Sequence, residues 1–249
     1  MSDVPAIFAA AVAADPARPL LTYYDDATGE RTELSGVTLG NWVSKTANLL
    51  VDGLGLGPGG RADLLLPPHW QTAAILLASW SAGLTVGYRP WSTAGLAAHT
   101  EGEPDVVFVS HERQRSFLED VPDADERFVL SLHPFGMPMR EVPDGYRDFN
   151  AEVRVFGDVF RPSALPSPAT PATPDGTTFG AWGEIIGHIA GEMGLKPGDR
   201  VLIDAGLHEQ PMQWLLAPLA AGASIVLCAN ADPAKTAARA ESERVTRIL

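Results

Sequence analysis

Residues 195–227 read LKPGDRVLIDAGLHEQPMQWLLAPLAAGASIVL, and this stretch decides the fold. A Pro-Gly pair precedes a short apolar run that begins at Arg200 and is typical of a buried strand. Helical spacing follows, and Gly222 supplies the left-handed cap that ends a helix. A second apolar run begins at Ser224. The order strand, helix, strand at these lengths predicts a parallel crossover unit, and hence an α/β fold.

The same pattern occurs earlier in the chain, where residues 54–83 read LGLGPGGRADLLLPPHWQTAAILLASWSAG. The two stretches match at an offset of 139 (208 − 69) and share Pro, Gly and His residues, which periodicity alone does not dictate. Before the two matched stretches, Thr178 corresponds to Thr38 at an offset of 140 (178 − 38). The helix after Thr38 therefore contains one extra residue. We interpret 176–249 as a repeat of 38–90, and we expect two related βαβ-rich subdomains packed together.

Proline marks the expected boundary between the subdomains. Residues 161–173 read RPSALPSPATPAT, a composition that favours an extended linker and excludes a central strand or helix. We therefore expect a first α/β subdomain over 1–160, a Pro-rich linker over 161–175 and a second α/β subdomain over 176–249. Residues 245–249 are expected to form a last strand at a sheet edge.

Composition limits the classes of partner. The chain has 31 acidic against 18 basic residues and a formal net charge of −13, so we expect no nucleic acid or anionic membrane as a partner. No apolar run approaches the roughly 18 residues of a membrane span, and the start lacks the basic flank of a signal peptide. We expect a cytoplasmic protein. Its one cysteine, Cys228, lies in an apolar run and is expected in the core.

Four stretches resemble the framework of a known superfamily. Residues 20–50 (LLTYYDDATGERTELSGVTLGNWVSKTANLL), 54–83, 195–227 and 231–249 (ADPAKTAARAESERVTRIL) are similar, in this order, to the N-terminal domain of the acyl-adenylate-forming (AMP-binding) enzymes. These include acyl-CoA synthetases, luciferases and the adenylation domains of peptide synthetases. The resemblance implies their α/β fold with two similar front subdomains.

The same resemblance implies where ATP would bind. In the family, a Gly/Ser/Thr-rich loop ending in Pro-Lys-Gly cradles the phosphates ahead of the LKPGDRVL-like segment. Here Asp175, Gly176, Thr177 and Thr178 hold that place and are weak cofactor-binding candidates, but no lysine lies between Lys45 and Lys196. Asp175 would bring a negative charge towards the phosphates. We interpret these four residues as a turn and a helix cap, and we predict no cofactor.

The remaining catalytic motifs of the family lie beyond the segments matched here. We therefore expect a truncated, non-catalytic relative, assign no catalytic residue and predict no metal. Four residues are candidates to line a ligand cleft. His69 and His208 follow equivalent strands, and Arg89 and Trp91 follow the carboxyl end of a strand, the usual rim for ligands in parallel sheets. We favour the simpler interpretation for each: a helix cap or packing at the helix entry for the histidines, and a turn at the strand end for Arg89.

Three hypotheses about function remain open at this point. The first is a truncated relative of acyl-CoA synthetases with a cleft for a small molecule or a protein partner. The second is a structural or regulatory subunit that self-associates as a homodimer through its edge strand. The third is a residual AMP- or acyl-CoA-ligase activity completed by another polypeptide.

Overall fold

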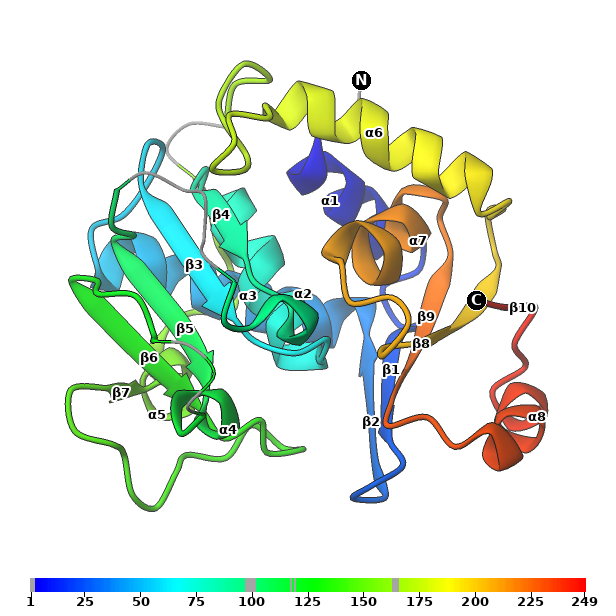
Figure 1. Cartoon of the computed structure of the whole chain (residues 1–249). Coiled ribbons are helices and arrows are strands. Elements are labelled where there is room, and N and C mark those ends of the chain that lie inside the picture. Colours follow the sequence, from blue (N-terminus) through cyan, green and yellow to red (C-terminus); the bar gives the residue numbers. More distant parts are fainter. Residues whose placement is uncertain (1–2, 97–101, 117, 119, 163–165) are drawn as a thin grey trace.

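Two five-stranded sheets, with helices between them and on their outer faces, make up the fold (Figure 1). The computed structural model describes residues 3–96, 102–116, 118, 120–162 and 166–249. Sheet A has the order β10-β8-β9-β1-β2, and sheet B has the order β4-β3-β5-β6-β7. Among the strands of these two sheets, as far as the structure describes the chain, β1 and β2 pair antiparallel and the other pairs are parallel. The predicted α/β fold is confirmed.

The elements have the following bounds. Sheet A contains β1 (Pro19–Asp25), β2 (Glu30–Ser35), β8 (Arg200–Asp204), β9 (Ser224–Ala229) and β10 (Arg247–Ile248). Sheet B contains β3 (Arg61–Leu65), β4 (Thr85–Tyr88), β5 (Val106–Ser110), β6 (Glu126–Leu130) and β7 (Arg147–Asp148). The helices are α1 (Val4–Ala14), α2 (Gly36–Asn48), α3 (Trp70–Ser81), α4 (His111–Gln114), α5 (Phe149–Glu152), α6 (Phe179–Glu192), α7 (Ala217–Ala220) and α8 (Pro233–Ser242).

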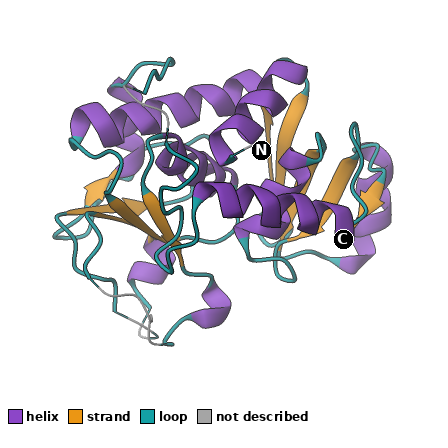
Figure 2. Ribbon diagram, turned by 90° about the horizontal axis from the view of Figure 1, so that it is seen from above, coloured by secondary structure: helices purple, strands orange, loops and turns teal. Residues whose placement is uncertain are grey.

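A layer of helices between the two sheets forms the centre of the molecule. Helix α1 contacts α2, α3, α6 and α7, and Figure 2 shows this group lying between the strands of the two sheets. Every residue of α3 except Ser81 is buried, so this helix runs through the core. Helix α8 covers the opposite face of sheet A, where Cys228 is fully buried as predicted. None of the described helices is long and apolar enough to cross a bilayer.

The first helix of the earlier repeat unit, α2, begins at Gly36, ahead of Thr38. Ser35, rather than Thr38, is the N-cap of α2, and its Oγ accepts from the Thr38 amide at 3.2 Å. In the second unit Thr178 does cap α6, because its Oγ1 accepts from the Ala181 amide at 3.3 Å. A π-helical turn at Leu49–Gly53 follows α2. Since a π turn contains one residue more than an α turn, it accommodates the extra residue of the first unit.

The two crossover units have the same order of elements. Strands β8 and β9 begin at the offset of 139 from β3 and β4. Gly83 (φ +81°) and Gly222 (φ +72°) end the intervening helices in the left-handed conformation, as predicted. That residues 176–249 repeat residues 38–90 stays an interpretation.

The Pro-rich segment packs against sheet B. The Val86 amide donates to Ala172 O at 2.9 Å, and the Trp80 indole donates to the same oxygen at 3.1 Å. Ala172 is fully buried. Part of the segment, 163–165, lies outside the described residues. The division at 161–175 stays a prediction, although sheet pairing crosses it, because β1 pairs with β9. Strand β10 lies at the edge of sheet A, as expected.

Candidate functional site

Loops from both sheets meet at one place, which we call the rim and define as residues 88–92 and 204–210. These segments follow the carboxyl ends of β4 and β8. The Ser92 amide donates to Glu209 Oε2 at 3.0 Å, which joins the two loops across the gap between the sheets. Loops after the carboxyl ends of parallel strands are the usual place for ligands in α/β proteins.

Two buried polar atoms at the rim have no hydrogen-bond partner among the described residues. They are the Tyr88 hydroxyl and His208 Nδ1. Burial raises the pKa of Tyr88 far above its usual range, and the nearby Glu209 carboxylate adds to this effect. The hydroxyl is therefore neutral and able to donate. Buried polar atoms ordinarily have partners, so each of these two atoms offers an unused hydrogen bond to a ligand or water.

A buried arginine supports the first rim loop from below. Arg113 Nη1 donates to Arg89 O at 2.5 Å, and its guanidinium lies 5.4 Å from the centroid of the Trp91 ring. The Trp91 side chain remains exposed, with 41% of the residue surface accessible. This arrangement holds an aromatic surface at the edge of the site.

Arg89 has its own carboxylate partner. Its Nη2 donates to Asp63 Oδ2 at 3.1 Å, and Asp63 also pairs with Arg61. The charge of Arg89 is therefore partly compensated within the chain. Arg89 and Trp91 lie on one rim segment and His208 on the other, and their grouping around a ligand, like the binding of an anion by Arg89, stays a prediction.

His69 lies elsewhere in the molecule. It is 2% exposed and is the N-cap of α3, where its Nδ1 accepts from the Gln71 amide at 3.1 Å. Its ring packs on Tyr23 at 4.4 Å between centroids, and burial lowers its pKa despite Glu30, whose Oε1 is 3.8 Å from Nε2. In the described part of the chain, no hydrogen bond, ion pair or ring contact joins His69 to the other three candidates, so a shared cleft stays a prediction.

The segment 175–178 folds as a turn that leads into α6. Asp175 Oδ1 accepts from the Thr173 hydroxyl at 2.6 Å and from the Thr177 amide at 3.0 Å. These bonds lower the pKa of Asp175. Gly176 adopts φ +86°, and Thr178 caps the helix. The geometry is that of the turn and helix cap predicted from sequence; cofactor binding here stays untested.

Sequence analysis missed two groups of the site. Ser92 contributes only its backbone N–H, which any residue except proline provides, so no signal marked it. Arg113 lies in α4, which Ser110 caps, and its burial beneath Trp91 depends on tertiary packing, which the sequence does not indicate. No group of three His, Cys, Asp or Glu side chains among the described residues has the geometry of a metal site.

Comparison with known proteins gives one close relative. A curated protein of Mycobacterium tuberculosis (strain ATCC 25618 / H37Rv), described as a TIGR03089 family protein, is 42% identical over 240 residues, which is 95% of this chain and 93% of that protein. The chain belongs to the TIGR03089 family. No family model matches the sequence.

Solved structures confirm the fold of this TIGR03089 family member. Acetoacetyl-CoA synthetase from Streptomyces lividans (TM-score 0.67, 20% identity), Brucella canis acyl-CoA synthetase (0.76, 17%) and the anthranilate CoA ligase AuaEII in complex with anthranoyl-AMP (0.70, 14%) each match over 99% of the chain. The chain spans 42%, 46% and 49% of their lengths, respectively. Its fold is that of the N-terminal domain of adenylate-forming enzymes, as the sequence resemblance implied.

Proposed function

We propose that this TIGR03089 family protein binds a small carboxylic acid at the rim and does not form an adenylate on its own. The observation that carries the proposal is that each rim segment has a buried polar atom without a hydrogen-bond partner, Tyr88 Oη at the end of β4 and His208 Nδ1 in the loop after β8. The similar solved structures are acyl-CoA synthetases and a ligase complexed with anthranoyl-AMP, which makes a small carboxylic acid the chemical class to test first.

The rim has complementary groups for such a ligand. The Tyr88 hydroxyl donates to a carboxylate or carbonyl oxygen, and His208 does the same when Nδ1 carries the proton. Trp91 offers an exposed ring for an aryl or alkyl group. The Glu209 carboxylate, which accepts from the Ser92 amide, repels any anion, so hydrogen bonds from the two donors have to outweigh this repulsion when a carboxylate binds.

The chain's own charges disfavour adenylation. At the segment equivalent to the family's phosphate loop, the Asp175 carboxylate is fixed by hydrogen bonds that favour its ionised form. No lysine lies between Lys45 and Lys196, so this segment lacks the cation that phosphates require.

Ligand binding is tested by thermal unfolding with acetate, acetoacetate, anthranilate, benzoate and octanoate. A ligand at 100 times its Kd stabilises the folded state by about 2.7 kcal/mol, which raises the unfolding midpoint. The variants Tyr88→Phe and His208→Ala should abolish the shift. His188→Ala is the matched control, because His188 lies on α6 with its side chain 77% exposed. If no acid raises the midpoint, or if the rim variants respond like the control, this site is not a carboxylic acid site.

Adenylation is tested separately by ATP–pyrophosphate exchange with the same acids. We expect no exchange above the no-enzyme background. Robust exchange by the isolated chain contradicts the second half of the proposal but leaves binding at the rim intact. Exchange that requires a second polypeptide supports the alternative of a ligase completed in trans.

A further inference from the structure

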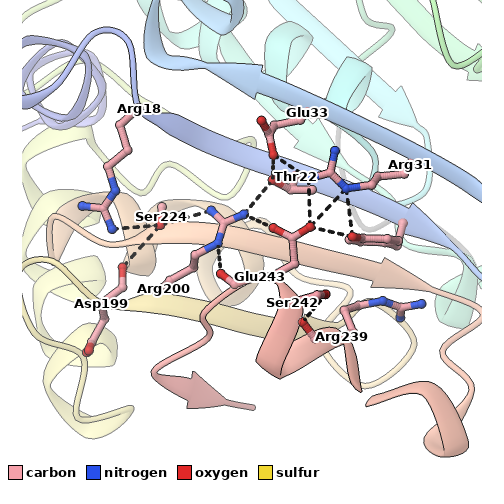
Figure 3. Close-up of polar contacts among 11 residues, drawn as sticks. Arg18, Thr22, Arg31, Glu33, Asp199, Arg200, Ser224, Arg239, Ser242 and Glu243 are labelled. Atoms are coloured by element: carbon pink, nitrogen blue, oxygen red, sulfur yellow. Dashed lines mark hydrogen bonds and ion pairs between the residues drawn. The ribbon is translucent and has the colours of Figure 1, made fainter. Parts of the chain in front are cut away.

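A second polar groove lies at the opposite end of sheet A from the rim. Its volume is about 530 Å³. The groove collects residues that precede or begin strands β1, β8 and β10, together with the end of α8 (Figure 3). Along β8, Arg200 and Asp204 are four residues apart, so the groove and the rim are about 13 Å from each other. The lining residues with formal charge are Arg18, Arg31, Arg200, Arg244, Glu33 and Glu243.

Some of the charged side chains in the groove form ion pairs with one another. Glu243 pairs with Arg200 through Oε2 and with Arg31 through Oε1, the latter at 2.9 Å. Arg31 also pairs with Glu33 at 2.6 Å. Figure 3 shows these side chains converging from β2, β8 and the end of α8. Two arginines are therefore balanced by two glutamates.

The other two arginines of the groove have no carboxylate partner among the described residues. Arg18 Nη2 donates to Gly198 O at 3.2 Å and approaches Ser224 Oγ at 3.5 Å. Arg200 Nη1 lies 3.5 Å from the same hydroxyl, so nitrogens of two guanidinium groups are at most about 7 Å apart. Glu243 compensates the charge of Arg200, whereas Arg18 has no carboxylate partner among the described residues, so an anion beside Arg18 would compensate its charge.

Arg244 occupies a position where glycine is usually favoured. It follows the last turn of α8 with φ +53°, a left-handed conformation that disfavours a side chain. The Arg244 amide donates to Glu241 O at 3.1 Å, which fixes the turn. Arg244 is exposed and is one of the residues that line the groove. A conformational cost at an arginine that lines a groove points to a role in binding.

We propose that this groove binds a small dianion, such as a phosphate or a dicarboxylate, between Arg18 and Arg244. Four arginines against two glutamates give the lining residues a net charge of +2, on a chain whose formal net charge is −13. The groove therefore attracts anions locally although the protein as a whole repels them. This site is distinct from the rim and does not depend on the function proposed there.

The experiment is a titration of 15N-labelled protein with inorganic phosphate, and separately with succinate, at constant ionic strength. The amide signals of Arg18, Thr246 and their neighbours should shift in a saturable manner, whereas those of Ser92 at the rim should not. Saturation by phosphate alone identifies a phosphate site, and saturation by succinate alone identifies a dicarboxylate site. The absence of saturable shifts with either anion overturns the proposal.

Two variants test the assignment of the cations. Arg18→Gln and Arg244→Gly should each weaken binding about tenfold, since each removes one charge-assisted contact. Arg244→Gly relieves the left-handed backbone, so the variant should unfold at an unchanged or higher urea concentration, and lost binding cannot then be ascribed to misfolding. Arg140→Gln, at an exposed arginine outside the groove, is the matched control. Equal affinity in all three variants contradicts the proposal.

Discussion

Replacing Glu243 tests how much its buried ion pairs contribute to the stability of the fold. Its side chain is 8% exposed, and it accepts from Tyr24 Oη at 2.5 Å while pairing with Arg200 and Arg31. Burial alone would raise its pKa, but the hydrogen bonds from Tyr24, Arg200 and Arg31 outweigh it and lower the pKa from 4.5 to about 2. Because Arg200 is also buried, the variant Glu243→Gln leaves a desolvated cation without its counter-charge.

The size of the effect follows from the pKa. A depression from 4.5 to about 2 corresponds to about 3 kcal/mol of stability at neutral pH. The folded protein binds the proton less tightly than the unfolded chain, so this contribution is complete above about pH 5 and is lost as the pH falls towards 2. At pH 3 about half of it should remain. The Arg239 guanidinium holds the pKa of Asp26 well below its usual range, so Asp26 also makes stability depend on pH. This contribution is the same in wild type and in Glu243→Gln and cancels when their stabilities are subtracted.

Urea unfolding of wild type and Glu243→Gln between pH 7 and pH 3 measures this difference. We expect the variant to be less stable by about 3 kcal/mol at pH 7, with a gap that narrows as the pH falls. Glu192→Gln is the control, because that glutamate is 67% exposed beside His188 and should change stability by less than about 0.5 kcal/mol. A gap below about 1 kcal/mol at pH 7, or one independent of pH, refutes the reasoning.

Three further substitutions test the packing, each measured by urea unfolding at pH 7. Trp80→Phe removes one of the two donors to the buried Ala172 carbonyl, which keeps its bond from the Val86 amide, and should cost about 1 kcal/mol; no loss would mean that the indole N–H does not bind this carbonyl. Gly87→Ala should cost more than about 1 kcal/mol, because a Cβ there overlaps the Asp63 carboxylate; a neutral result would contradict that close approach. Ser35→Ala should cost about 1 kcal/mol through loss of the α2 cap, and an unchanged midpoint would place the cap elsewhere.

Much of the fold could be predicted because local chemistry specifies it. Apolar runs between turn residues located β3, β4, β8 and β9 to within about a residue or two, since buried parallel strands require such runs. The left-handed caps at Gly83 and Gly222 were likewise visible in the sequence. The pairing of β1 with β9 was not, because it joins segments some 200 residues apart whose partner choice depends on the packing of both sheets.

The candidate site was predictable only in part. Arg89, Trp91 and His208 were recognised from their places after strand ends, a rule that depends on topology alone. Their partners were not. Asp63 of the neighbouring strand pairs with Arg89, and no pattern in the sequence indicated that ion pair. His69 occupies the position equivalent to His208, but its ring is buried against Tyr23, and no periodicity distinguishes a buried histidine from one at a rim.

The most direct test of the central claim is a titration of protein labelled with 15N in its histidine rings, using anthranilate and acetoacetate in the absence of ATP. The account predicts that the ring nitrogen signals of His208 move in a saturable manner, because its buried Nδ1 gains a hydrogen-bond partner, while those of the exposed His188 stay in place. If His208 remains unchanged at saturating concentrations of both acids, or if all histidines shift alike, then the rim is not the binding site proposed here.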